Sequence, residues 1–466
     1  MAPGLFRLSA LLLLGAVLSG CATALDTAPI NVAASPSVAM EEAEGDRLDF
    51  GETAVALSFS GGGTRAAAFA HGVLEALHHQ EVPDARGGSL AERVPFVSAV
   101  SGGSVAAAYF AYRGPDGFDD FRERFLLQNV EASLRTSITP ANVIRALEGG
   151  VNDRSGLPRW LNANLFQGAT YGDIRRPGAP TLWLNASDIY NRNPFIFDYW
   201  TFSVICSDLD SYQLSEAVAA SAAVPIAFTP ILLRNYSDRC PYQQPEWVEA
   251  VIDNREAPAT LRAYADALDG YRDTARQPRI SLVDGGVTDN LGVYGLTVAR
   301  GTAEHAYEPM EPDDAVNLRN MLFVVVDAGR GPESDWPTRP GGPTGTQVAQ
   351  ATVDTMIESN VRYTYDAFSD AMERWRQDLI AWRCGLSASE VRRLRGSMAG
   401  WNCRDLEFQI VRVAFDAAKD PALRKRLNQV ETRFTLPEEE VDMLIRAGRA
   451  FLESDPGYQA FLEKLH

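Results

Sequence analysis

Cysteine and histidine are scarce in this chain, which has five of each among its 466 residues. Five cysteines are too few for a small disulfide-stapled scaffold, and no pair has the C-x-x-C spacing of a zinc ribbon, so we expect no metal site. Positive charge is scarce too, because 43 basic residues stand against 61 acidic ones and leave a net charge of -18. Such a surface repels phosphate backbones, and we expect no nucleic-acid partner.

A long hydrophobic run is also missing. The most apolar stretch, Leu8 to Leu18, has eleven residues. At about 1.5 Å per residue it is too short for a ~30 Å bilayer core. With Arg7 before it, the stretch is typical of a signal peptide, which we assign to residues 1–20. The chain as a whole is 46% hydrophobic and 22% charged, a composition typical of a globular protein that buries a core.

The end of this stretch carries a possible membrane anchor. Leu18-Ser19-Gly20-Cys21 resembles the lipobox of bacterial lipoproteins. The resemblance implies that Cys21 is lipidated and begins the mature chain, and that Ala22 beside it favours passage to the outer membrane, facing the periplasm. Several acyl chains on one cysteine would hold the protein firmly on the membrane. The alternative is an ordinary signal peptide that contains a cysteine by chance.

Export would place the other cysteines in a compartment that permits disulfides. They are Cys206, Cys240, Cys384 and Cys403. Four cysteines allow three pairings, of which the nearest-neighbour choice joins Cys206 to Cys240 and Cys384 to Cys403.

Three glycine-rich turns each follow a short apolar run that predicts a buried strand. The first is Gly61-Gly62-Gly63-Thr64-Arg65, which precedes a helical pattern with its apolar residues on one face. Strand, glycine loop and helix in this order can form an anion site, because a helix N-terminus has unpaired N–H groups. The alternative is a tight turn. A nucleotide loop is not favoured, since Ala66 takes the third glycine position and no Gly-Lys-Ser/Thr follows.

The second and third turns each carry a reactive side chain. Ser101-Gly102-Gly103-Ser104 follows the strand predicted at residues 95–100, and a serine at a sharp strand-to-helix turn is typical of a nucleophile elbow. Ala99 stands where that motif has glycine, and alanine is small enough. Asp284-Gly285-Gly286 ends another short apolar run, although Asp-Gly-Gly is also simply a good turn. The carboxyl ends of strands are where open α/β sheets place ligands.

In this order the three motifs resemble those of the patatin-like phospholipase family, over about residues 54–296. The resemblance implies that Gly61-Gly62-Gly63 forms an oxyanion loop and that Ser101 and Asp284 form a Ser–Asp dyad. Residues 182–188 resemble the family's central strand, and residues 217–225 its helix before a proline. Arg65 fixes the loop, meets a phosphate head group, or is a surface arginine at the start of a helix. The supporting positions around the dyad are Gly102, Gly103, Gly285 and Gly286.

The fold that this resemblance implies is a three-layer α/β/α sandwich around a mostly parallel sheet. We place a lipidated N-terminus and flexible tether at residues 21–52 and the catalytic core at residues 53–330. An insertion at residues 232–278 is either a lid or a surface elaboration. A mostly helical extension, residues 331–466, includes a long helix over Gln347 to Trp382.

The function we expect is hydrolysis of ester bonds in phospholipids or lysophospholipids, without a cofactor. A carboxylesterase or transacylase acting on another ester would share every motif. A catalytically inactive lipoprotein scaffold is the third hypothesis. The dyad should need no histidine, because His78 and His79 lie at the far end of their helix and His305 lies away from the strand ends. His71 resembles a structural histidine of the family.

The lipobox hypothesis makes one direct prediction. Cys21→Ser should release the protein from membrane fractions or leave its precursor unprocessed, because no other residue of the motif can carry the acyl chains. Fractionation and mass spectrometry of the N-terminus measure both outcomes. A fully soluble wild-type protein with an unmodified N-terminus would refute the anchor.

Overall fold

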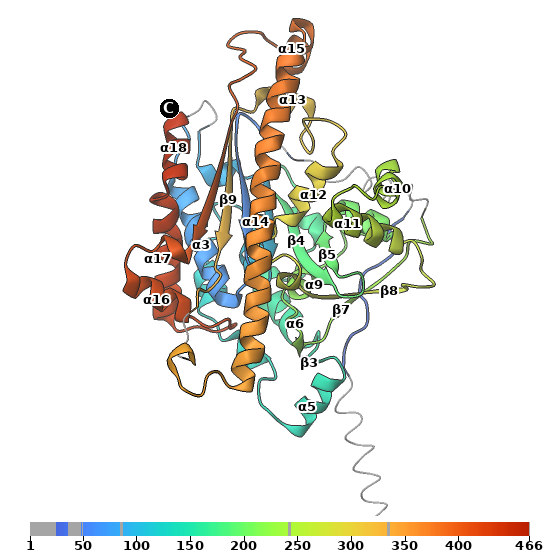
Figure 1. Cartoon of the computed structure of the whole chain (residues 1–466), viewed down its shortest axis with the longest axis vertical. Coiled ribbons are helices and arrows are strands. Elements are labelled where there is room, and N and C mark those ends of the chain that lie inside the picture. The colour runs from blue at the N-terminus through green and yellow to red at the C-terminus, as the bar shows by residue number, and fades with distance from the viewer. Residues whose placement is uncertain are drawn as a thin grey trace, which may run out of the picture.

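The structure is a computed structural model that describes residues 25–35, 48, 50–83, 87–240, 244–332 and 336–465. Its centre is an eight-stranded sheet in the order β10-β9-β1-β2-β4-β8-β7, with β5 beside β4 (Figure 1). The strands of this sheet are β1 (Thr53–Phe59), β2 (Phe96–Val100), β4 (Thr181–Asp188), β5 (Asn193–Phe197), β7 (Ile231–Arg234), β8 (Arg279–Asp284), β9 (Asn320–Asp327) and β10 (Glu407–Ala414). A second, two-stranded sheet pairs β3 (Gly150–Asn152) with β6 (Ile226–Phe228).

The main sheet is mostly parallel, as the sequence predicted. All pairs from β10 to β4 are parallel, whereas β4 with β5, β4 with β8 and β7 with β8 are antiparallel. Strand β1 is buried on both faces: Val55 and Leu57 belong to one core cluster, Ala54 and Ala56 to the other. A strand buried on both faces has an almost continuous apolar sequence, which is why this run was recognisable.

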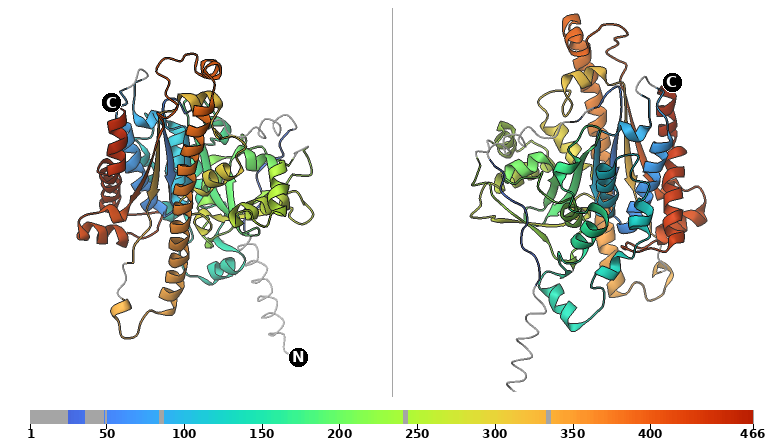
Figure 2. Two further views of the ribbon diagram at one scale, coloured as in Figure 1. Left: turned by 45° about the horizontal axis from the view of Figure 1, so that its top comes forward. Right: turned by 180° about the vertical axis from the view of Figure 1, so that it is seen from behind.

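Helices cover both faces of the sheet and form the expected three layers. On one face lie α3 (Gly63–His79), α4 (Gly102–Arg113), α9 (Leu214–Ser221) and α17 (Glu438–Glu453). On the other lie α12 (Tyr294–Thr302), α13 (Pro312–Asn317) and α14 (Gly345–Gly385). Figure 1 shows α14 running along the sheet, and the view from behind in Figure 2 shows the opposite layer. Helix α14 confirms the long helix predicted from the sequence.

The other helices lie around this sandwich. They are α5 (Pro140–Leu147), α6 (Leu157–Leu161), α7 (Tyr171–Ile174), α8 (Tyr199–Val204), α10 (Glu246–Asp253), α11 (Ala259–Gly270), α15 (Ala388–Arg395), α16 (Pro421–Gln429) and α18 (Pro456–Lys464). Helices α10 and α11 form the insertion, where Trp247 stacks on Tyr264 and the Thr260 carbonyl accepts a hydrogen bond from Tyr294. None of the helices among the described residues combines the length and the apolar character needed to cross a bilayer.

The N-terminal segment differs in part from the predicted tether. Residues 1–20, Cys21 and residues 36–47 lie outside the described residues. Residues 25–35, in contrast, pack on the core: the Asn31 side-chain amide donates to Ser207 Oγ at 2.9 Å, and Ala34 N–H donates to the Cys206 carbonyl at 3.0 Å. These hydrogen bonds fix a stretch whose composition alone predicts flexibility.

Both disulfides follow the nearest-neighbour pairing. Cys206 is bonded to Cys240 and Cys384 to Cys403, with Cα–Cα distances of 5.9 and 4.9 Å. The first ties the segment after α8 to the insertion, and the second joins the end of α14 to the chain that leads into β10. Each bridge closes a loop and thereby restricts the unfolded chain.

The C-terminal region is part of the sandwich, because it supplies β10 to the edge of the main sheet. It also supplies α17, which crosses α3 at a pair of glycines. A Cβ atom on Gly72 would lie 2.0 Å from the carbonyl oxygen of Ile445, and one on Gly448 would lie 2.2 Å from the carbonyl oxygen of Phe69. The two helix backbones touch here, and only glycine leaves room for that contact.

This crossing predicts a stability effect of Gly72→Ala. The added methyl group must push α17 away from α3, so the free energy of unfolding should fall by about 1–3 kcal/mol, the usual cost of overpacking. Gly301→Ala in α12 is the matched control, since the nearest atom to its new Cβ is 3.9 Å away and alanine favours a helix. Chemical denaturation of both variants checks this. Equal midpoints for the two would contradict the close crossing.

Candidate active site

Two strand ends meet head to head to form the site. Strand β2 runs parallel to β4 and its last pair is Val100 with Asn185. Strand β8 runs antiparallel to β4 and ends with Asp284 opposite Ala186, the next residue of β4. Because β5 occupies the other edge of β4, β2 and β8 share one edge and approach from opposite directions. The residues that end them, Ser101 and Asp284, are therefore neighbours.

Ser101 lies at a strained turn. Its φ is 51° and its ψ is -118°, a backbone conformation that non-glycine residues seldom adopt. The turn is held by Ser221, the last residue of α9: Ser101 N–H donates to Ser221 Oγ at 2.8 Å, and Ser221 Oγ donates to the Asn185 carbonyl at 2.6 Å. Ser104 Oγ also contacts Ser221 Oγ at 2.8 Å. This arrangement has the geometry predicted for a nucleophile elbow.

Asp284 is buried beside the serine turn, and Gly286 N–H donates to its Oδ1 at 2.8 Å. Burial disfavours the charged form and outweighs the opposing influence of Ser101 and Gly286, so the pKa of Asp284 rises from 3.8 to about 6. A carboxylate with this pKa is ionised at neutral pH and is a better proton acceptor than an ordinary aspartate.

The N–H groups of the glycine loop are not all engaged in hydrogen bonds within the described chain. Gly61 N–H donates to the Asn290 carbonyl at 3.1 Å, so it is not available to an oxyanion, in contrast to the expectation for all three glycines. Within the part of the chain that the structure describes, the N–H groups of Gly62 and Gly63 have no intramolecular acceptor. Gly102 follows the serine and is the first residue of α4. Its N–H group likewise has no acceptor among the described residues. These three donors surround the serine turn.

Close approach explains the glycines beside the reactive residues. A Cβ on Gly102 would lie 2.0 Å from the Gly63 carbonyl oxygen, and one on Gly285 would lie 2.2 Å from the Asn185 carbonyl oxygen. Gly103 and Gly286 are restricted similarly, by Ser60 and Asn290. The supporting glycines predicted from sequence thus let the serine loop touch the glycine loop and let the aspartate loop touch β4.

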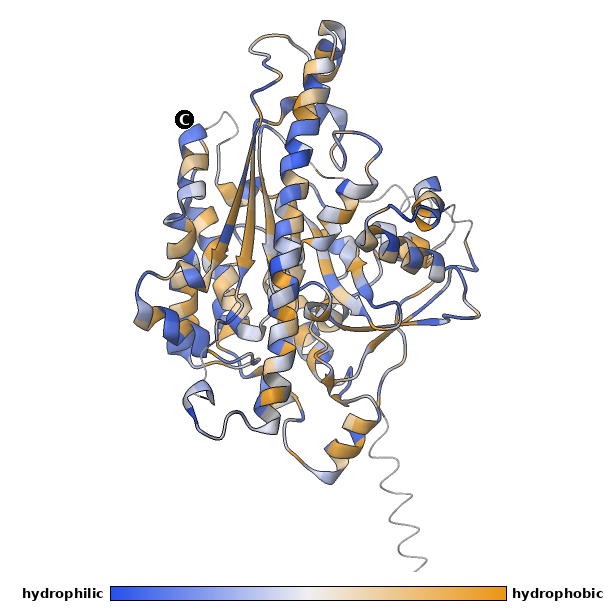
Figure 3. Cartoon of the chain, in the orientation of Figure 1, coloured by the Kyte–Doolittle hydropathy of each residue, from blue (hydrophilic) through white to orange (hydrophobic). Residues whose placement is uncertain are grey.

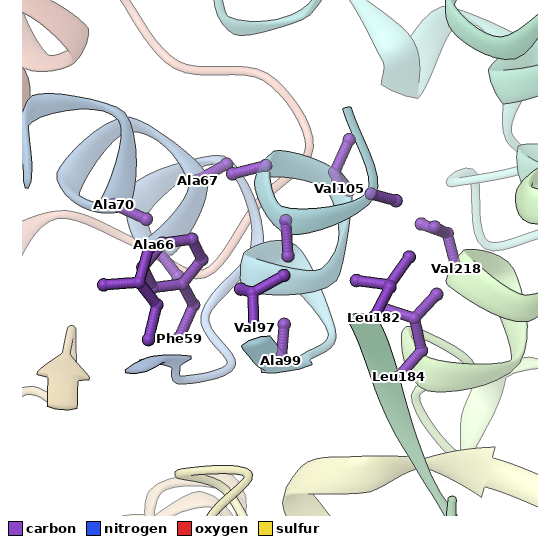
Figure 4. Packing of buried hydrophobic residues seen from close by; sticks show 14 of the residues in the cluster. Phe59, Ala66, Ala67, Ala70, Val97, Ala99, Val105, Leu182, Leu184 and Val218 are labelled. Carbon is purple, nitrogen blue, oxygen red and sulfur yellow. The ribbon is translucent and has the colours of Figure 1, made fainter. Parts of the chain in front are cut away.

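Ala99 and Ala66, where the sequence departs from the expected small-residue pattern, both lie in the core. Figure 4 shows Ala99 beside Val97 beneath the first turn of α4, and Ala66 against Phe59. A methyl group therefore fits at either position.

Arg65 fixes the loop. Its guanidinium is 4% exposed and donates to the carbonyls of Ala328 and Val430 and to Thr432 Oγ1, at 2.9–3.0 Å. Burial and the nearby Arg330 charge lower the pKa of Arg65 to about 9. Of the three roles that the sequence left open, these contacts are those of a residue that fixes the loop, and its burial is not that of a surface arginine.

Two residues of the site were not singled out from the sequence. Ser221 holds the serine turn, although its segment was recognised as a helix before a proline. The side chain of Asn290 lies between two loops: methyl groups on Gly61 and Gly286 would lie 2.5 and 2.7 Å from its Oδ1. It follows Asp284 by six residues, and that spacing after the Asp-Gly-Gly turn was the available signal.

The described histidines have their contacts elsewhere. His71 is buried between the rings of Phe118 and Phe121, where burial lowers its pKa to about 4. His78 contacts Phe118 and His79, and His305 stacks on Tyr307. His466 lies outside the described residues.

The fold and the serine turn together define an α/β protein with a nucleophile-elbow serine. The family model for patatin-like phospholipases matches residues 57–297, just over half of the chain. The chain therefore belongs to the patatin-like phospholipase family, whose members are lipid acyl hydrolases. This confirms the family that the three motifs resembled. No curated protein matches the chain.

Solved structures give more distant similarities. Human GIVD cytosolic phospholipase A2 is 12% identical, with 92% of this chain and 65% of that chain covered and a TM-score of 0.39. VipD from Legionella pneumophila is 12% identical, with 88% and 66% covered and a TM-score of 0.33. ExoU in its complex with SpcU, from Pseudomonas aeruginosa, is 14% identical, with 90% and 66% covered and a TM-score of 0.27. The chain thus spans about two thirds of each of these chains.

The raised pKa of Asp284 predicts the pH dependence of ester hydrolysis. If this carboxylate accepts the Ser101 proton, it must be ionised, so kcat/KM should fall as the pH drops through about 6. A histidine base would titrate in the same range, which makes His78→Gln, His79→Gln and His305→Gln the necessary controls. All three should keep the wild-type profile. If one of these variants lost its activity while it stayed folded, that histidine, and not Asp284, would be the catalytic base.

Proposed function

We propose that this protein is a serine acyl hydrolase that cleaves ester bonds of phospholipids or lysophospholipids through a Ser101–Asp284 dyad. The observation that carries the proposal is the meeting of β2 and β8 on one edge of β4, which places the strained, 5% exposed Ser101 next to the buried Asp284. A hydroxyl aimed at a carboxylate of raised pKa can be deprotonated as it attacks. Family membership supports a lipid ester as the substrate class.

The reaction takes two steps. Ser101 Oγ attacks the ester carbonyl while its proton passes to Asp284, and the tetrahedral intermediate collapses to an acyl-enzyme. Asp284 returns the proton to the leaving alcohol. Water then attacks the acyl-enzyme, gives a proton to Asp284, and releases the fatty acid as Ser101 recovers that proton. The dyad ends in its starting state.

Negative charge that develops on the carbonyl oxygen needs donors nearby. The N–H groups of Gly62 and Gly63 and of Gly102 are suited to this task, because they lie at the N-termini of α3 and α4. Removal of one such donor from an enzyme typically costs about 3 kcal/mol of transition-state stabilisation. The contact of Gly102 with Gly63 keeps these donors together.

The protein would act at the cell envelope. We propose that a lipid on Cys21 tethers it to a bacterial outer membrane on the periplasmic side, where phospholipid substrates surround it. The lipobox-like segment supports this. Two disulfides among the described residues suit an oxidising compartment.

A fluorophosphonate probe tests the serine assignment. It should label the wild-type protein and the Ser211→Ala variant, which loses only an exposed serine, but not Ser101→Ala. Labelling of Ser101→Ala at the wild-type rate would remove Ser101 from the mechanism. Absence of labelling in the wild type would favour the inactive scaffold.

Mass spectrometry of lipids tests the substrate. Incubation with mixed phospholipids and lysophospholipids should release fatty acid, and Asp284→Asn should abolish the release. Turnover of simple esters without any phospholipid cleavage would favour a carboxylesterase. Transfer of the acyl group to an alcohol other than water would favour a transacylase.

A further inference from the structure

Helix α5 turns its apolar side chains outward. Ile138 before the helix is 96% exposed and Leu147 at its end is 84% exposed, with Val143 and Ile144 about half exposed between them. The helix is well formed, since Thr139 caps it by accepting from Asn142 N–H and Pro140 occupies its first position. A surface helix normally buries its apolar stripe, so this orientation needs an explanation outside the isolated chain.

The charged residue of α5 points the other way. From Thr136 to Leu147 the only ionisable side chain is Arg145, and it is buried with its guanidinium 3.4 Å from Asp153 Oδ2. The outer surface of this segment therefore carries no charge. It can leave water without the large cost of desolvating an ion.

This surface continues to the candidate active site. Strand β3, which follows α5, pairs Gly150 with Ile226, and Ile226 is 69% exposed with a φ of 73° that is unusual for a β-branched residue. Val224, two residues earlier, is also exposed. The carbonyl of Ala223 accepts the N–H of Asp284 at 2.9 Å, so the apolar surface reaches the backbone of the catalytic acid.

We call this surface the α5–β6 face, and it consists of Ile138, Val143, Ile144, Leu147, Val224 and Ile226. Figure 3 shows α5 as an apolar helix at one end of the molecule, and Figures 1 and 2 show that it projects beyond the sandwich there. Val287, three residues after Asp284, is exposed as well and adds to the apolar surroundings of the site.

The described chain begins next to the same face. Asp26 N–H donates to Asp153 Oδ2 at 3.1 Å, and Asp153 is the residue that binds Arg145 of α5. Cys21 precedes Asp26 by five residues, which span about 18 Å at most at ~3.6 Å each. An acyl anchor on Cys21 would thus hold this end of the molecule, rather than the opposite end, against a membrane.

We propose that the α5–β6 face inserts into the surface of a phospholipid bilayer and so presents the dyad to lipid esters. The proposal rests on the proposed function for the dyad. Apolar insertion suits this face better than charge attraction, because the face is uncharged and the chain carries a net charge of -18.

Photo-crosslinking tests the contact without catalysis. Leu147 is replaced by p-benzoylphenylalanine in the full-length Ser101→Ala protein, which is irradiated on phosphatidylcholine vesicles. The expected result is a phospholipid adduct on the peptide that contains α5. The control places the same group at Tyr363, which is 75% exposed. Tyr363 lies 18 residues, about 27 Å, along α14 from the first residue of that helix. It should give no adduct. No adduct at position 147, or an adduct to a second protein chain, would overturn the proposal.

A kinetic comparison tests the consequence. The double variant Ile138→Glu, Leu147→Glu should hydrolyse vesicle phospholipid at least about tenfold more slowly, since two apolar side chains no longer enter the bilayer. Hydrolysis of a soluble short-chain ester should not change, and it verifies that the variant is folded. Equal vesicle activity in the variant and the wild type would refute the docking face. If the wild type were inactive on both substrates, the proposed function would be wrong. The crosslinking experiment would still test the α5–β6 face, because it needs no catalysis.

Discussion

The burial of one carboxylate beside one hydroxyl is the constraint on which this structure depends. The pKa of Asp284 is raised to about 6 because burial removes the water around its carboxylate, and the hydrogen bond from Gly286 N–H offsets only part of that effect. That environment requires two strands to end against each other on one edge of β4. It also requires glycine at Gly102 and Gly285, where the loops that carry the two side chains touch neighbouring backbone. Strain at Ser101 is maintained by the hydroxyl of Ser221.

The C-terminal region contacts the glycine loop and holds it in place. Arg65 donates to the carbonyl of Ala328, just before that region, and to that of Val430 within it, and Thr64 N–H donates to the carbonyl of Arg433. Helix α17 presses on α3 through Gly448, and β10 completes the sheet beside β9. A segment that begins after the family match therefore positions the loop that the family match contains. Its removal would expose the apolar face of α3 as well as release the loop.

Exposed apolar side chains are found around the candidate active site. The end of the molecule that carries Ser101 and Asp284 is bordered by exposed valine, isoleucine and leucine side chains, although the chain as a whole has an acidic excess. Asp153 links three parts of that end, because it binds Arg145 of α5, the N-terminal segment at Asp26, and its own turn at Ser155. One buried carboxylate thus ties the start of the described chain to the border of the site.

The sequence by itself determined the local elements and the candidate residues of the site. Apolar runs at β1 and β9 are readable because strands buried on both faces exclude polar residues, and Ser101 and Asp284 stand out because glycines follow them. Only the tertiary structure decided how these meet. The strands that end at Ser101 and Asp284 run in opposite directions, and the two residues are neighbours because β8 enters the same edge of β4 as β2 from the far end. Likewise, the hydrogen bond that occupies Gly61 N–H, the inward turn of Arg145 and the packing of residues 25–35 depend on partners distant in sequence, which no local pattern encodes.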